Sequence, residues 1–298
     1  MGAGLAGLSA ADALVAAGHA VALFDKGRGP GGRMSTRRVE RDGTTLAFDH
    51  GAQYLTARYA AFAEQVAAWE AAGIVARWPA AGPDALVGTP GMNAPVRALA
   101  ARHAVAWNTR IDALTREGAG WSFAGERFDT AIVAVPAEQA ATLLGDHPFA
   151  ATARATPTQP CWTVMAAFDQ PVPAPDIVRD AGAISWAARD GAKPGRAGTE
   201  TWVIQASPDW SVLHLEDNAD TVAAALLRAW AAACGIDQPQ PLHLLAHRWR
   251  YARSGGSGDR ALWNAESRLG VCGDWLIGPR VEAAWLSGRQ IAARIAAS

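Results

Sequence analysis

"MGAGLAGLSAADALVAAGHAVALFD", residues 1–25, is the stretch that decides the fold of this chain. Its residues Gly2, Gly4 and Gly7 form the pattern G-x-G-x-x-G, which in dinucleotide-binding folds joins a buried strand to a helix. Glycines let the backbone approach a pyrophosphate closely, and the N-terminus of the helix that follows offers N–H groups to the anion. In a chain with 30 glycines, the same pattern also suits the start of an ordinary Ala- and Gly-rich helix. The pattern alone therefore does not establish a dinucleotide site, and a second observation has to support it.

The residues after the turn supply that observation. Apolar side chains at helical spacing predict a helix over residues 5–17, which Gly18 ends, and residues 20–25 predict a short buried strand. Asp25 ends this strand near the spacing at which a carboxylate binds the ribose hydroxyls of adenosine. A carboxylate there also disfavours a 2′-phosphate, so we expect that the bound adenosine is not that of NADP. The stretch predicts a dinucleotide site in a βαβ unit.

The first strand of this unit should precede the glycine turn, but the turn begins at the second residue of the sequence. In a doubly wound sheet that strand is central and buried on both faces. Losing about four buried aliphatic side chains would cost roughly 6–12 kcal/mol, which rivals the ~5–15 kcal/mol stability of a typical domain. We therefore expect the native start to lie upstream of Met1. Without another segment in that place, we expect poor folding or weak cofactor binding.

The composition bounds the function. The chain has 298 residues, of which 50% are hydrophobic, and a formal net charge of −1. It is long enough for two domains and carries no electrostatic footprint for nucleic acid or an anionic membrane. Three widely spaced cysteines argue against a disulfide framework or a zinc site, and no apolar run is long enough to span a bilayer. We expect a cytoplasmic protein with a small-molecule substrate and no metal, nucleic-acid or membrane partner.

A basic, glycine-rich loop follows Asp25. Residues 27–38, GRGPGGRMSTRR, are too rich in Gly and Arg for regular structure. Gly31 and Gly32 permit the close approach of a ligand, and Arg33 can donate two parallel hydrogen bonds to a phosphate. A solvated basic loop and a nucleic-acid contact are the alternatives. The loop resembles the signature of flavoprotein amine oxidases, in which a Gly-Gly-Arg segment wraps the FAD diphosphate.

The far end of the chain carries a second motif. Residues 271–295, VCGDWLIGPRVEAAWLSGRQIAARI, resemble the C-terminal FAD motif of the same superfamily. The resemblance implies that Asp274 binds the ribitol and that the helix starting at Val281 points its N-terminus at the flavin pyrimidine ring. Such a terminus stabilises the anion formed when the flavin is reduced. The two motifs predict noncovalent FAD held by Gly2, Gly4, Leu5, Ala6, Gly7, Asp25, Lys26, Gly32, Arg33, Met34, Gly273, Asp274, Val281, Glu282 and Ala283.

Further segments extend the resemblance over nearly the whole chain. They are FDHGAQYLT (48–56), GTPGMNAPVRAL (88–99), AKPGR (192–196), WVIQASPDWS (202–211) and HRWRYA (247–252). In this combination the sequence resembles bacterial renalase-like proteins. The resemblance implies an FAD-dependent oxidase that takes hydride from aberrant 2- or 6-dihydro isomers of NAD(P)H and passes the electrons to O2. The products would be NAD(P)⁺ and hydrogen peroxide.

Two alternatives remain open. Related amine oxidases use a lysine near flavin N5 and paired tyrosines beside the flavin, because an amine must lose a proton before it is oxidised. The lysines here are Lys26 and Lys193 only, and the tyrosines are Tyr54, Tyr59 and Tyr251. A dihydropyridine becomes aromatic when it gives up hydride, so it needs alignment more than a general base. An amine oxidase is therefore the second interpretation, and a truncated, non-catalytic flavoprotein is the third.

Candidate substrate residues follow from side-chain chemistry and from the resemblance. Gln53 and Tyr54 lie in a segment that the resemblance brings close to the flavin. Trp186 and Trp202 can stack on a pyridine ring. Arg250 lies on one face of a predicted strand and can meet an anionic dinucleotide. Tryptophans in the core and a strand with salt-bridged arginines would explain the same residues.

Together these patterns predict an α/β protein with a doubly wound, Rossmann-like FAD-binding domain and an inserted β-rich α+β substrate domain. The FAD-binding domain would comprise residues 1–58, 88–145 and 262–298, and the substrate domain residues 59–87 and 146–261. Within the substrate domain, apolar spacing predicts a helix over 219–234.

Overall fold

The glycine turn leads directly into helix α1 (Leu5–Ala16), which strand β1 (Leu23–Phe24) follows. The computed structural model describes residues 1–196 and 198–298. Helix α1 begins at the predicted residue and ends one residue before the predicted end, whereas β1 is shorter than the predicted strand over 20–25. Only its two residues pair with β6 (Val105–Ala106), and this pairing is parallel, as in doubly wound sheets.

A second parallel ladder lies beside the first. Strands β10 (Ala131–Val133) and β17 (Leu269–Val271) pair in parallel, and β16 (Leu262–Asn264) pairs antiparallel with β17. The Met1 ammonium donates a 2.8 Å hydrogen bond to the carbonyl beside it on β10, and the Gly2 N–H donates a 2.8 Å bond to the last residue of β1. The start of the glycine turn therefore lies between the two parallel ladders.

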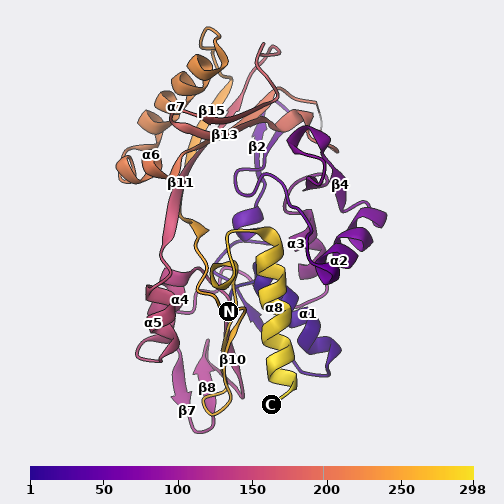
Figure 1. Cartoon of the computed structure of the whole chain (residues 1–298), viewed down its shortest axis with the longest axis vertical. Coiled ribbons are helices and arrows are strands. Elements are labelled where there is room, and N and C mark those ends of the chain that lie inside the picture. The colour runs from indigo at the N-terminus through magenta and orange to yellow at the C-terminus, as the bar shows by residue number, and fades with distance from the viewer. Residues whose placement is uncertain (197) are drawn as a thin grey trace.

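Helix α8 (Val281–Ala296) packs beside α1 (Figure 1). Their close approach depends on Gly288, because a Cβ there would lie 2.2 Å from the Ala6 carbonyl oxygen. The buried Ser9 hydroxyl donates a 2.8 Å hydrogen bond to the Trp285 carbonyl. The first and last helices of the chain thus form one layer against the parallel strands. These parallel strands with their helices confirm the predicted α/β class.

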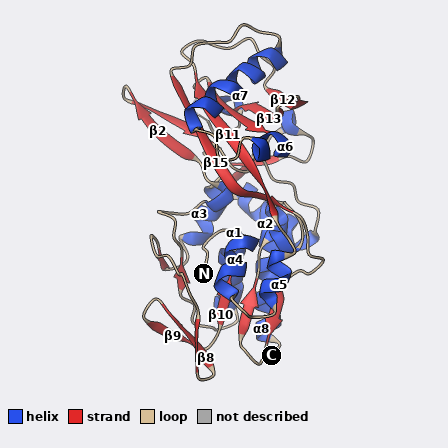
Figure 2. Cartoon of the chain, turned by 90° about the vertical axis from the view of Figure 1, so that its left-hand side faces the viewer, coloured by secondary structure: helices blue, strands red, loops and turns tan. Residues whose placement is uncertain are grey.

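The upper part of the molecule in Figure 1 is a five-stranded antiparallel sheet in the order β12-β13-β14-β11-β15. Its strands span Ile177–Ala181, Ile184–Arg189, Thr201–Ala206, Thr158–Ala167 and His243–Ser254. Helix α7 (Ala219–Cys234), which has the predicted bounds, lies across this sheet (Figure 2). Its buried residues Leu226 and Trp230 pack against sheet residues such as Ile204, so the sheet and the helix share one core.

Shorter elements complete the fold. The hairpin β2 (Arg37–Arg41) and β3 (Thr44–Phe48) packs Phe48 against Met165 of the large sheet. The remaining elements are α2 (Ala60–Ala71), β4 (Val75–Arg77), β5 (Leu86–Gly88), α3 (Ala94–Ala100), β7 (Thr115–Glu117), β8 (Gly120–Phe123), β9 (Glu126–Phe128), α4 (Ala137–Leu144), α5 (Phe149–Arg154), α6 (Pro208–Leu213) and the 3-10 turns η1 (Gly32–Met34), η2 (Pro79–Ala81), η3 (Asp190–Ala192) and η4 (Asp274–Leu276). No helix in the described ranges combines the length and the hydropathy needed to cross a membrane.

Candidate cofactor and substrate site

Two glycines of the opening turn are required by its packing. Gly2 has a φ of +91°, and a Cβ there would lie 2.4 Å from the Ala134 carbonyl oxygen. A Cβ on Gly7 would lie 1.9 Å from the Gly2 carbonyl oxygen, far inside van der Waals contact. At Gly4, by contrast, the described residues leave the Cβ position open. The turn therefore has one closed side and one open side, and the open side meets the N-terminus of α1, where N–H groups have no intrahelical partner.

Asp25 holds this turn in place. Its Oδ2 accepts a 2.6 Å hydrogen bond from the Ala3 N–H, and its Oδ1 accepts a 2.6 Å bond from the Gly27 N–H. The carboxylate thus ties the glycine turn to the start of the basic loop. Asp25 also lines the same cavity as Gly4, so it is positioned to bind a ligand lying on the turn.

We expect Asp25→Ala to raise the dissociation constant of FAD by roughly 10- to 150-fold, since hydrogen bonds to a charged group contribute about 1.5–3 kcal/mol. The variant loses the carboxylate that anchors Ala3 and Gly27. The measurement is a titration of flavin-free protein with FAD, followed by flavin fluorescence. Asp237→Ala, which removes an exposed loop carboxylate, is the control and should bind FAD like the unmodified protein. Unchanged affinity in Asp25→Ala would remove this residue from the site.

A cavity of about 1070 Å³ extends from the glycine turn to the large sheet. Segments far apart in sequence line it, among them the basic loop, the residues after β17 and the start of α8. Of the predicted FAD residues, it is lined by Gly2, Gly4, Leu5, Ala6, Asp25, Lys26, Gly32, Arg33, Met34, Gly273, Asp274 and Val281, and of the predicted substrate residues by Gln53, Tyr54, Trp186 and Arg250. The glycine cradle, the carboxylates, the arginine and the two helix N-termini suit a dinucleotide such as FAD.

Three predicted FAD residues lie behind the cavity wall. Gly7 packs against the Gly2 carbonyl inside the turn, and Ala283 is fully buried. The buried Glu282 carboxylate accepts hydrogen bonds from the N–H groups of Arg58 (2.6 Å) and Tyr59 (2.8 Å). These residues do not line the cavity; they support its wall.

Trp202 is the prediction that the structure contradicts. Its side chain is fully buried, its ring lies 4.6 Å from that of Trp230, and its Nε1–H donates a 2.8 Å hydrogen bond to Glu200. It belongs to the core between the large sheet and α7, so it is not available to stack on a substrate. Every residue of β14 is buried, so both faces of the strand are covered. The sequence pattern alone does not tell which of these faces lies in the core and which lines a cavity.

At the far end of the cavity, an aromatic and cationic wall is built from residues of two segments. The Tyr54 and Trp186 rings are 5.5 Å apart, and the Arg179 guanidinium lies 4.7 Å from the Trp186 ring. Arg179 also donates a 2.6 Å hydrogen bond to the Ala81 carbonyl, which fixes it in that position. Arg179 lines the cavity together with Arg58 and Arg280, and no sequence motif marks any of these three arginines, so they were not predicted.

Arg250 also lines the cavity, but its guanidinium is engaged elsewhere. Its Nη1 and Nη2 donate hydrogen bonds of 2.7 and 2.8 Å to the two carboxylate oxygens of Glu216. Arg248 binds the same carboxylate at 2.9 Å. The alternative interpretation of this strand, with salt-bridged arginines, is therefore what the contacts support.

Gln53 lines the cavity while its amide is used inside the wall. Its Nε2 donates to the carbonyls of Asp49 (2.5 Å) and Gly51 (3.1 Å), and its Oε1 accepts a 3.1 Å hydrogen bond from Lys193 Nζ. The Lys193 side chain is fully buried and also pairs with Asp190 at 2.6 Å. Lys193 therefore lies behind Gln53 and does not reach the cavity surface.

Lys193 belongs to a buried charge cluster, which we define as Asp49, Asp190, Lys193 and Arg196. Burial would raise the pKa of Asp49, but the charges of Lys193 and Arg196 outweigh it and hold that pKa below its usual value. Burial raises the pKa of Asp190, against the opposing effect of Lys193. The cluster thus pairs two carboxylates with two cations whose side chains are at most 4% exposed, and the backbone N–H of Asp49 donates a 3.0 Å hydrogen bond to Asp190.

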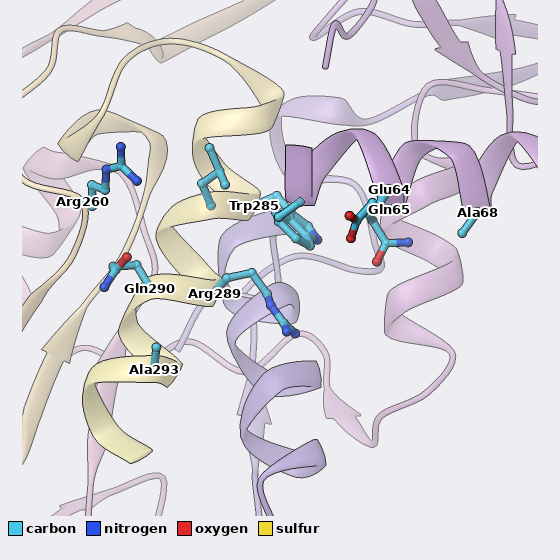
Figure 3. Close-up of a pocket in the computed structure, with 10 residues that line it drawn as sticks. Glu64, Gln65, Ala68, Arg260, Trp285, Arg289, Gln290 and Ala293 are labelled. Atoms are coloured by element: carbon cyan, nitrogen blue, oxygen red, sulfur yellow. The ribbon is translucent and has the colours of Figure 1, made fainter. Parts of the chain in front are cut away.

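A second, smaller pocket of about 600 Å³ lies between α2 and α8 (Figure 3). Trp285 and Arg289 of α8 line it opposite Glu64 and Gln65 of α2. None of the predicted cofactor or substrate residues is among its lining residues. The described part of the chain also holds no group of three or more His, Cys, Asp and Glu side chains arranged for a metal ion. The larger cavity is therefore the candidate site.

Comparison with known families agrees with this geometry. Residues 1–68 match the NAD(P)-binding Rossmann-like domain, and residues 70–296 match the Flavin containing amine oxidoreductase family. The first match covers the glycine turn and the basic loop, and the second reaches the C-terminal motif.

Solved structures share the fold at low identity. A provisionally named protoporphyrinogen oxidase from Exiguobacterium sp. 255-15 aligns with a TM-score of 0.76 at 14% identity, covering 99% of this chain and 97% of that one. A triple mutant of putrescine oxidase gives 0.73 at 15% identity, with coverage of 99% and 97%. Cyclohexylamine oxidase from Brevibacterium oxydans IH-35A gives 0.70 at 13%, with coverage of 99% and 97%. Because the family match spans most of the sequence, the chain belongs to the flavin containing amine oxidoreductases, and its cofactor is a flavin.

Proposed function

We propose that the protein is a renalase-type oxidase with noncovalently bound FAD. Its substrates would be 2- or 6-dihydro isomers of NAD(P)H, and its products NAD(P)⁺ and hydrogen peroxide. The observation that carries the proposal is the wall of Tyr54, Trp186 and Arg179 in the same cavity as the cofactor residues. Bound FAD supplies a two-electron acceptor for hydride and a route for both electrons to O2, which takes up the hydride-derived proton and one further proton.

The residues of this wall suit a flat, anionic ligand. The Tyr54 and Trp186 rings can stack on a dihydropyridine and hold it parallel to a second flat ring. Arg58, Arg179 and Arg280 line the cavity and favour the phosphates of a dinucleotide. The same guanidinium groups disfavour an alkylammonium ion, the form in which an amine exists at neutral pH.

The position of Lys193 bears on the amine alternative. An amine oxidase needs a group that accepts the substrate proton or positions water at the reacting centre. Lys193 Nζ is instead engaged by Asp190 at 2.6 Å and by Gln53 at 3.1 Å, and its side chain has no exposed surface. The site therefore better suits a substrate that donates hydride without the help of a base, such as a dihydropyridine.

Anaerobic mixing tests the proposal. We expect 2- or 6-dihydro-NAD to bleach the visible absorbance of the flavin rapidly after anaerobic mixing. Oxygen should then restore the absorbance, with release of hydrogen peroxide. A panel of small amines is the matched comparison and should leave the absorbance unchanged. Bleaching by an amine, with no response to the dihydro isomers, would instead establish the amine oxidase. A yellow protein that neither class of substrate bleaches would point to the non-catalytic flavoprotein.

A further inference from the structure

Two arginines of β15 share one carboxylate beside the large cavity. Arg250 Nη1 and Nη2 donate hydrogen bonds of 2.7 and 2.8 Å to the two carboxylate oxygens of Glu216, and Arg248 Nη1 donates a 2.9 Å bond to Oε2 of the same group. Glu216 lies in the loop between α6 and α7. Two guanidinium charges therefore face one carboxylate charge, which leaves one positive charge in excess at this place.

The two arginines are held differently. Arg248 also donates a 2.5 Å hydrogen bond to the Leu215 carbonyl, and its guanidinium lies 5.5 Å from the Trp162 ring. Within the described part of the chain, the hydrogen bonds of the Arg250 guanidinium all go to Glu216. Arg250 is also the one of the two that lines the cavity. A ligand in the cavity can therefore take Arg250 from Glu216, while Arg248 stays in its position.

The loop that carries Glu216 is anchored on the large sheet. The Trp162 Nε1–H of β11 donates a 2.8 Å hydrogen bond to the His214 carbonyl, and His214 Nδ1 lies 2.7 Å from Asp217 Oδ2. The carboxylate of Glu216 is thus presented from a fixed backbone. The side chains of Glu216 and Arg250 are 68% and 41% exposed, so solvent screens their attraction and the pair opens at small cost.

We propose that Glu216 is a positioning residue that holds the Arg250 guanidinium at the edge of the cavity until the pyrophosphate of the dinucleotide substrate replaces the carboxylate. Arg250 then donates its two parallel hydrogen bonds to phosphate oxygens, and Glu216 stays paired with Arg248. Carboxylate and phosphate compete for one guanidinium, and this competition sets the preference of the cavity for phosphate-bearing dihydropyridines. The inference deepens the proposed function and rests on it.

Two substrates with the same reacting ring test the inference. 2-Dihydro-NAD carries the pyrophosphate, and the 2-dihydro isomer of nicotinamide riboside lacks it. We define the dinucleotide preference as the KM of the riboside divided by the KM of the dinucleotide. Glu216→Gln should raise this preference roughly two- to fivefold, because binding no longer has to open an ion pair. Arg250→Met should lower it by roughly tenfold, because the charge-assisted hydrogen bonds to phosphate are lost.

A double variant separates the hold on Arg250 from a general effect of charge. Glu216→Gln combined with Arg250→Met should give the preference of Arg250→Met alone, because Glu216 acts through that guanidinium. Asp217→Asn, which removes a carboxylate from the same loop, is the matched control and should leave the preference unchanged. An unchanged or lower preference in Glu216→Gln would overturn the inference. An equal rise in the Arg250→Met background would overturn it as well.

Calorimetric titration of the oxidised, flavin-loaded protein with NAD⁺ separates the inference from the reaction. NAD⁺ carries the same pyrophosphate, so its dissociation constant should fall in Glu216→Gln and rise in Arg250→Met by similar factors. If no dihydropyridine bleaches the flavin, the proposed function fails, and the NAD⁺ affinities then decide the inference: a dinucleotide that does not bind, or binds equally to all variants, overturns it. If the dihydropyridines react and the variants change neither quantity, the inference alone fails.

Discussion

Gly7→Ala is expected to remove nearly all flavin binding. The new Cβ would lie 1.9 Å from the Gly2 carbonyl oxygen, and a shift of Gly2 would disturb the 2.8 Å hydrogen bond from its N–H to the Phe24 carbonyl. The turn must shift, and with it the N–H groups that would bind the pyrophosphate. Losing two charge-assisted hydrogen bonds, at about 1.5–3 kcal/mol each, corresponds to a rise of roughly 100- to 10,000-fold in the dissociation constant of FAD.

The measurement is an FAD titration of the flavin-free variant, with a thermal melt to report the cost of the shifted turn. Gly29→Ala is the matched control, because the described residues leave its Cβ position open and it does not line the cavity. It should bind FAD like the unmodified chain. Full FAD affinity in Gly7→Ala would mean that the turn is a packing feature and that the cofactor binds elsewhere.

The second large effect is expected from the buried charge cluster. Lys193→Met leaves Asp49 and Asp190 with Arg196 as the one remaining cation of the cluster. An uncompensated buried charge costs about 3–5 kcal/mol of the free energy of unfolding. The variant should therefore unfold at a clearly lower urea concentration. Lys26→Met, the same substitution at an exposed lysine, should change the stability little.

A charge-balanced variant separates the role of the charge from that of the side chain. Lys193→Met combined with Asp190→Asn removes one charge of each sign, and the asparagine keeps an oxygen that can accept from the Asp49 N–H. It should recover most of the stability lost in Lys193→Met. If the single variant instead kept full stability and lost only amine oxidation, Lys193 would be the amine-oxidase lysine, and the dihydropyridine proposal would fail.

Local patterns predicted the regular elements well. The range 219–234 is that of α7, and the terminal helix begins at Val281 as expected, because apolar spacing and the end signals lie within a few turns of each helix. The strand over 20–25 was predicted too long, since strand length depends on a partner, β6, that lies about eighty residues further on. Asp25 and the glycines were recognisable because their chemistry and their spacing occur in one continuous segment.

The sequence by itself determined the α/β class, the dinucleotide turn and the flavin-type motifs at both ends, because these depend on residues close together in the chain. Only the tertiary structure decided which side chains meet. It paired Arg33 with Asp274, enclosed Lys193 behind Gln53 and placed Trp202 in the core. The first two of these contacts join segments more than a hundred residues apart. Whether a polar or aromatic side chain faces a cavity or the core depends on what packs against it. No local pattern contains that information.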